Sequence, residues 1–312
     1  MKKLLQDRVF SLLFTIILTA LAASVIFPGN FASFENISQI LLNVSIDSIV
    51  ATGMMILLIS GSFDLSVGSV AAFSGGIAAY LMHYYNTPVV LSIAIALLVS
   101  VIVGLVNGYL IAYQKINPLI QTLAMMGIIR GAALMIAGSG LTDLPYWFTA
   151  LGQSKLLSIQ MPVWYMIACI ALFTFLFNKR AFFRRYYFIG GNEKAAELSG
   201  IRVNKMVLYA FMLSALLAGI AGILLASRIG AVTSSFGRGM ELRVITAVIL
   251  GGASLTGGTG KIPGALLGSL FMGLIANIMI IARVSGYWQE IILGIILITA
   301  VWLDLKVKNK NQ

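Results

Sequence analysis

The sequence predicts an all-α protein that crosses a membrane many times. Of its 312 residues, 60% are hydrophobic and only 10% are charged, whereas soluble domains carry about 25% charged residues. Several apolar runs reach the roughly 20 residues that a helix needs to span a bilayer. These runs are too long and too uniformly apolar for the strands of a membrane barrel, which alternate over about 10 residues. We therefore expect one transmembrane domain, residues 1–312, built from helices.

Ten membrane-spanning helices are predicted from the apolar runs. They cover residues 9–27, 36–60, 64–82, 88–113, 117–138, 161–178, 206–228, 242–257, 262–282 and 288–305. Cytoplasmic segments of membrane proteins collect lysine and arginine. Lys2 and Lys3 precede the first run, and Lys306 and Lys308 follow the last. Ten crossings between these basic ends place both termini in the cytoplasm, so the net charge of +11 reflects orientation and does not indicate nucleic-acid binding.

The stretch GGASLTGGTGK, residues 251–261, has the glycines and the lysine of a phosphate-binding loop. That loop needs Gly, four residues, Gly-Lys and then Ser or Thr, whose hydroxyl binds Mg²⁺. Here Ile262 follows Gly260-Lys261, and Leu255 stands where the first glycine is needed. The spacing therefore argues against nucleotide binding, and no cofactor is expected on this chain. We interpret the stretch as a close-packed turn between two helices.

The largest cytoplasmic segment, residues 178–205, contains the pattern of a short helix. An asparagine suited to an N-cap precedes an acidic first turn, good helix formers follow, and a glycine suits the C-terminal stop. These residues are Asn192, Glu193, Ala195, Ala196, Leu198 and Gly200. A helix of this length has only marginal stability by itself. We expect that the bundle or a partner holds it, or that the segment is a solvated connector.

Four stretches carry a family resemblance: GSFDLSVGSV (61–70), YYFIGGNEKAAELSGI (186–201), AVILGGASLTGGTGKIPGALLG (247–268) and SGYWQEIILGIILITAVWLD (285–304). They resemble permease subunits of bacterial ATP-binding cassette (ABC) importers for ribose and related sugars. The likeness runs in order from about residue 36 to residue 304. It implies a multi-pass protein of the bacterial cytoplasmic (inner) membrane that moves a sugar or sugar-like solute by alternating access.

The resemblance also implies partners. Residues 192–201 correspond to the coupling helix, which docks on a separate ATPase subunit that binds ATP and Mg²⁺. A solute-binding protein delivers the solute outside, and a second permease copy or paralogue completes the transporter. The surrounding surface faces membrane lipid.

The chain departs from the family pattern at three charged positions. Arg243 stands where the family often has Asp or Asn, Asp47 where a neutral residue is common, and Glu290 where Gln is usual. These positions lie in or near the predicted spans, so specificity for ribose does not transfer safely.

Charged and polar residues inside the predicted spans are candidates for the solute pathway. A charge at mid-helix costs about 2.5–3.5 kcal/mol on insertion scales. Asp47 and Arg130 both fall near the middle of their spans, so they could pair with each other. They form either a structural ion pair, two water-facing groups or a polar lining for a sugar. The candidate pathway residues are Asn43, Asp47, Asp64, Asn107, Arg130 and Asn277.

Four arginines are predicted outside, against the usual bias. The loop after the seventh span carries Arg228, Arg238 and Arg243, and Arg283 follows the ninth span. They either extend to the interface beside apolar surface or dock a binding protein through its carboxylates.

Two other classes of function were weighed. An ion-coupled secondary transporter is not excluded by composition, although the family resemblance argues against it. A membrane-embedded enzyme would need clustered carboxylates or histidines. The ten acidic residues are scattered and His83 is the single histidine, so we expect neither an enzyme nor a metal site.

Overall fold

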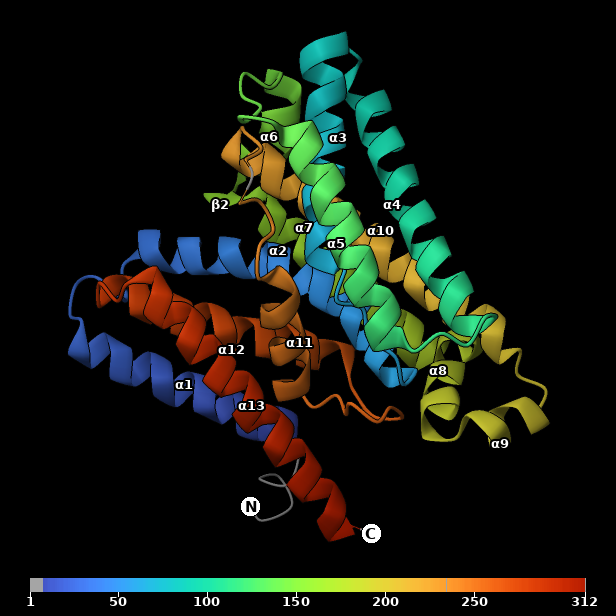
Figure 1. The fold of residues 1–312 in the computed structure, drawn as a ribbon. Helices are drawn as coiled ribbons and strands as arrows, with labels where there is room; N and C mark the ends of the chain where they lie inside the picture. The colour runs from blue at the N-terminus through green and yellow to red at the C-terminus, as the bar shows by residue number, and fades with distance from the viewer. Residues whose placement is uncertain (1–7, 234, 312) are drawn as a thin grey trace.

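The computed structural model describes residues 8–233 and 235–311. Within them the chain forms 13 helices and one two-stranded hairpin, arranged as in Figure 1. The helices are α1 (Arg8–Ile26), α2 (Phe34–Ile59), α3 (Val67–Tyr85), α4 (Val89–Ala112), α5 (Pro118–Ala137), α6 (Tyr146–Gln153), α7 (Met161–Lys179), α8 (Ala181–Gly191), α9 (Glu193–Leu198), α10 (Val203–Ile229), α11 (Met240–Leu250), α12 (Ile262–Ile281) and α13 (Gly286–Asn311). The antiparallel hairpin pairs β1 (Lys155–Leu156) with β2 (Ile159–Gln160).

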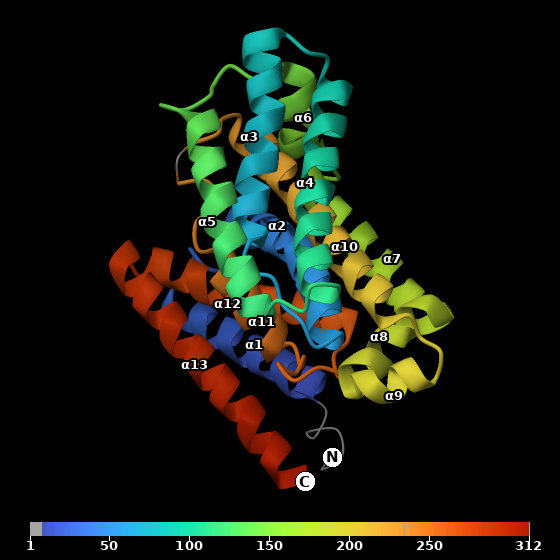
Figure 2. The same ribbon diagram turned by 45° about the vertical axis from the view of Figure 1, so that its right-hand side comes forward.

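Eight of the described helices are long and apolar enough to cross a membrane: α1, α2, α4, α5, α7, α10, α12 and α13. The predicted class, a polytopic all-α membrane protein, is confirmed. Helix α1 begins and α13 ends at the end of the molecule where α9 lies, whereas α6 lies at the opposite end (Figures 1 and 2). This arrangement agrees with two termini on the side of the predicted coupling helix.

Two of the ten predicted spans differ from that set. Helix α3 lies where it was predicted, but its small and polar residues keep it outside the set of apolar spans. The predicted helix over 242–257 is wrong in length, because α11 ends at Leu250. Its 11 residues reach about 16 Å, which is too short to cross a bilayer. Gly252, at φ +95°, takes the chain out of the helix.

The core is built around α2 and α10. Residues 44–46 and 48–59 of α2 are buried, and α10 packs against α2, α3 and α4. Burying apolar surface gives helices little reason to associate in lipid, so small residues that allow close backbone approach must supply the packing. Gly222 of α10 is such a residue: a Cβ there would overlap the backbone of Ala71 in α3.

The connection between α10 and α11 enters the bundle instead of staying on the surface. Phe236 is 5% exposed, and Gly237 lies against Gly68 near the start of α3. Arg130 of α5 donates to the carbonyl oxygens of Phe236 at 2.6 Å and Gly237 at 3.1 Å. Irregular backbone at membrane depth needs such partners, because lipid offers none. Arg130 therefore holds this connection in place.

We expect Gly222→Ala to destabilise the folded protein by ~1–3 kcal/mol, because its methyl group has no room against α3. Gly127→Ala is the matched control: it also lies in a spanning helix, but no atom would lie within 4 Å of its Cβ. Alanine loses less backbone freedom than glycine when the helix forms, so Gly127→Ala should leave the stability of the folded protein unchanged or raise it slightly. Thermal unfolding in detergent, followed by size-exclusion chromatography, measures both. Equal melting temperatures for the two variants would contradict this packing account.

Candidate functional site

Helix α9 is capped at both ends by its own sequence. The Asn192 side chain accepts from the Ala195 N–H at 3.0 Å. At the other end Gly200 has φ +81°, and the Ile201 N–H donates to the Ala196 carbonyl at 3.1 Å. This is the Schellman arrangement that ends many helices. The predicted short helix is confirmed in position and in both caps.

The bundle holds one face of α9 and leaves the other free. Ala196 is 3% exposed and packs in the main core, whereas Leu198 is 86% exposed. Glu193 forms an exposed ion pair with Lys115 of the α4–α5 turn, with Nζ and Oε1 3.4 Å apart. An exposed pair of this kind contributes little energy, so the buried Ala196 is the main anchor. The exposed leucine is the kind of residue that a partner would cover.

Helix α8, which precedes α9, ends against two other turns at the same end of the molecule. A Cβ on Gly190 would overlap the Ile59 carbonyl oxygen and lie 2.5 Å from the Gly258 nitrogen. The Gly258 N–H in turn donates to the Ile59 carbonyl at 3.0 Å. Residues 59–61, 190–191 and 257–260 thus meet backbone to backbone, and we call this the glycine junction.

Further contacts tighten the glycine junction. Gly257 has φ +87°, and a Cβ there would lie 2.9 Å from the Gly61 Cα and 2.7 Å from the Gly190 carbonyl oxygen. The Tyr187 hydroxyl donates to the Gly260 carbonyl at 2.9 Å. Burial raises the pKa of Tyr187 above its usual range, so that hydroxyl stays protonated and able to donate. The interpretation of GGASLTGGTGK as a close-packed turn is confirmed.

A polar cavity of about 300 Å³ lies at the other end of the bundle. Helix α10 begins beside α9 at Val203, and Arg228 on the cavity wall is 25 residues further along the same helix. At 1.5 Å per residue, the cavity and α9 are roughly 37 Å apart along α10. The polar residues that line it are Asn43, Asp47, Arg228, Arg243, Asn277 and Gln289. We call it the Asn43 cavity. It brings together three of the predicted pathway residues and one predicted docking residue.

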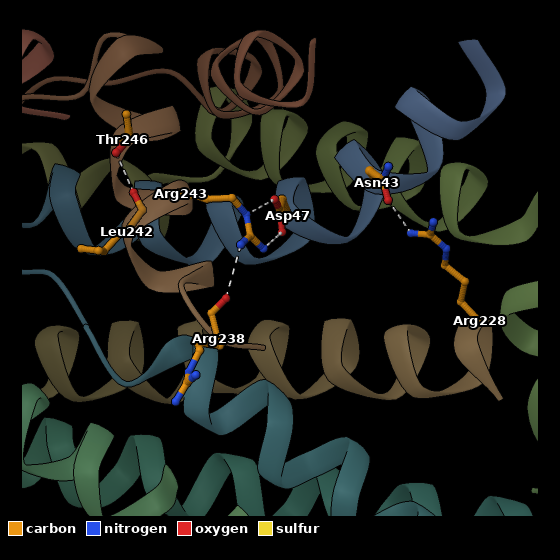
Figure 3. A network of polar contacts seen from close by, with 7 residues as sticks. All are labelled: Asn43, Asp47, Arg228, Arg238, Leu242, Arg243 and Thr246. Atoms are coloured by element: carbon orange, nitrogen blue, oxygen red, sulfur yellow. Dashed lines mark hydrogen bonds and ion pairs between the residues drawn. The ribbon is translucent and has the colours of Figure 1, made fainter. Parts of the chain in front are cut away.

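The predicted pair of Asp47 with Arg130 is wrong. Arg243 of α11 binds Asp47 instead, with Nε 3.1 Å from Oδ2 and Nη2 3.4 Å from Oδ1 (Figure 3). Arg130 is taken up by the α10–α11 connection, which lies between α5 and the interior. Counting residues along each span gives depth but not facing direction, so it could not identify the partner. The departures from the family pattern at positions 47 and 243 were the signal, because they bring opposite charges.

Two other side chains complete the polar wall. Arg228 donates to the Asn43 side-chain oxygen at 2.8 Å (Figure 3). Asn277 of α12 and Asn36 of α2 exchange two amide hydrogen bonds, at 2.7 and 3.1 Å. Arg228 therefore lines the cavity, and its docking role stays a prediction. Arg238 and Arg283 are exposed, and their docking role stays a prediction.

Asp64 and Asn107 lie elsewhere, in a fully buried chain of hydrogen bonds. The Ser66 hydroxyl donates to Asp64 at 2.6 Å, Asn107 donates to the Ser66 hydroxyl at 3.1 Å, and Gln121 donates to Asn107 at 3.2 Å. This chain connects α3, α4 and α5. Neither predicted pathway residue lines the Asn43 cavity, and their contacts are those of helix–helix packing.

Comparison with known proteins decides the family. Residues 36–301 match the profile of the branched-chain amino acid transport system permease component. The chain belongs to this family of transport permeases. The match spans most of the helical bundle, so the chain is a membrane transport protein of the cytoplasmic membrane and not an enzyme.

Individual relatives cover almost the whole permease. The L-arabinose transport system permease protein of Escherichia coli (strain K12) is 41% identical over 293 residues, which is 90% of this chain and 86% of that protein. The ribose import permease protein of Haemophilus influenzae (strain ATCC 51907 / DSM 11121 / KW20 / Rd) is 35% identical over 306 residues, 96% of this chain and 93% of that protein. The ribose import permease protein of Bacillus subtilis (strain 168) is 37% identical over 274 residues, 87% and 85%. No solved structure matches the chain significantly.

We expect Gly190→Ala to impair transport by the permease strongly, because its methyl group would force the glycine junction apart. Gly191→Ala is the matched control, since no atom lies within 4 Å of the Cβ that it adds. Both variants should insert in the membrane, because insertion is decided by the apolar length of the spans. Solute uptake per inserted protein measures the difference. Normal uptake by Gly190→Ala would show that the junction can loosen without consequence.

Proposed function

We propose that this permease is the membrane-spanning subunit of a sugar importer of the ABC class, and that its solute is a five-carbon sugar or a close analogue. The relatives named above carry L-arabinose and ribose, which are both pentoses. The observation that carries the proposal is the Asn43 cavity. It places amides, a carboxylate and two guanidinium groups in an otherwise apolar bundle, and a polyhydroxylated solute needs such donors and acceptors.

The size of the cavity supports a small solute. Its volume of about 300 Å³ is at the lower end of ordinary ligand pockets, which run from roughly 300 to 1,000 Å³. In the proposed pathway Asn43 and Asp47 face solute hydroxyl groups, while Asp64 and Asn107 brace the bundle. Arg238 and Arg283 would meet a solute-binding protein outside.

Energy would enter at the other end, through α9. The exposed face of α9 around Leu198 would dock on an ATPase subunit, and the ATP and Mg²⁺ would be bound there and not by this chain. A second permease copy or paralogue would offer a second α9, since two ATPase subunits need two docking helices. The glycine junction would pass the motion of α9 to the ends of α2 and α12.

Reconstitution tests this function. The permease with its ATPase and binding protein should take up labelled pentoses into proteoliposomes when ATP is supplied, and hexoses and polyols serve as competitors. Uptake that needs an ion gradient and no ATPase would instead support an ion-coupled transporter, the class for which interrupted helices such as the α10–α11 connection are typical. Failure of every pentose, with ATP-driven uptake of another solute, would reject only the solute class.

We expect Leu198→Asp to reduce co-purification of the ATPase and ATP-driven uptake at least several-fold, because a charge replaces the exposed apolar contact. The permease itself should fold normally, since Leu198 is 86% exposed. Leu157→Asp is the control: this residue is 78% exposed in the β1–β2 turn, far from α9. Normal ATPase binding by Leu198→Asp would mean that α9 is a connector and not the docking helix.

A further inference from the structure

A second cavity, of about 700 Å³, lies beside the Asn43 cavity. We call it the Glu290 cavity, since Glu241 and Glu290 line it and do not line the first. Arg243, Ala276 and Gln289 line both cavities. The two spaces are thus neighbours that share one wall, and Arg243 provides its charged side chain.

Asp47 holds Arg243 in that wall. The ion pair joins α2 to α11 through two nitrogen–oxygen contacts (Figure 3). The side chains are 34% exposed for Arg243 and 23% exposed for Asp47. The Arg243 guanidinium also donates to the Arg238 carbonyl oxygen at 3.4 Å. The pair is therefore accessible from the cavities, unlike a pair sealed in the core, and it can be exchanged for contacts with water or solute.

Helix α11 is a short helix between glycines with positive φ: Gly239 at +71° before it, and Gly252 at +95° after it. It packs against the backbone of α12, because a Cβ on Gly268 would overlap the Ala247 carbonyl oxygen, so a displacement of α11 would carry α12 with it relative to α2. Beyond Gly252 the chain runs directly into the glycine junction at Gly257 and Gly258. The helix therefore carries Arg243 near its first end, and its last end leads to the contacts of α8 and the segment before α9.

We propose that Arg243 is the gate residue of this permease. Paired with Asp47, it closes the passage between the Asn43 cavity and the Glu290 cavity. A displacement of α11, transmitted from α9 through the glycine junction, separates the pair and joins the two spaces, so that solute passes. This inference rests on the proposed role of the Asn43 cavity in the solute pathway.

Cross-linking in the complete transporter tests the gate. Asp47→Cys and Arg243→Cys are combined in a Cys169→Ser background and treated with a reducible bifunctional thiol reagent of ion-pair length. His83→Cys with Thr142→Cys is the control, because these exposed residues lie in contact at the end of α3 and line neither cavity. Cross-linking yield is measured with and without a non-hydrolysable ATP analogue, and uptake before and after reduction.

We expect ATP analogue to lower the yield of the 47/243 cross-link several-fold and to leave the 83/142 cross-link unchanged. Cross-linking 47 to 243 should lower uptake below the level that the same double-cysteine protein shows before cross-linking, and reduction should return it to that level, whereas cross-linking 83 to 142 should be tolerated. The proposed gate would be rejected if ATP analogue left the 47/243 yield unchanged and the cross-linked protein continued to take up solute. The cross-linking yield does not depend on which solute is supplied. If the wild-type transporter carries no pentose, the proposed solute class is rejected, and the cross-linking result stays valid.

Discussion

Close contact between bare backbones at the glycine junction is the constraint on which the rest of the structure depends. Gly190 meets the Ile59 carbonyl and the Gly258 nitrogen with no room for a side chain. In lipid, tight van der Waals packing and hydrogen bonds must replace the hydrophobic effect as the force between helices. Segments packed this closely shift together or separate; they do not deform gradually. The junction therefore packs the end of α8, just before α9, tightly against the end of α2 and the turn that leads into α12.

The same principle explains how the two ends of the molecule differ. At the glycine junction, close glycine contacts and a backbone hydrogen bond bring three turns together. At the Asn43 cavity, charged and amide side chains line an open space, and α11 is too short to close it as a full span would. The Asp47–Arg243 pair takes the place of that missing packing. Alternating access would require both features: the close-packed glycine junction at one end and an exchangeable ion pair at the other.

Local features were predictable from the sequence, and facing directions were not. The caps of α9 at Asn192 and Gly200 use hydrogen bonds within a few residues, so the pattern alone located the helix. The partner of Asp47 depended on how the α10–α11 connection enters the bundle, and no count along a span could show that. Gly190 and Gly191 are identical neighbours in sequence, yet only at Gly190 would an added Cβ meet another backbone.

The central claim is that motion of α9 reaches α11 through the glycine junction. Electron paramagnetic resonance can measure this in the complete transporter, with spin labels at Lys194 on α9, Leu242 on α11 and, as a fixed reference, Leu105 on α4. These three positions are exposed. The account predicts that an ATP analogue which shifts the distance from Lys194 to Leu105 also shifts the distance from Leu242 to Leu105. Movement of α9 with α11 unchanged would contradict it.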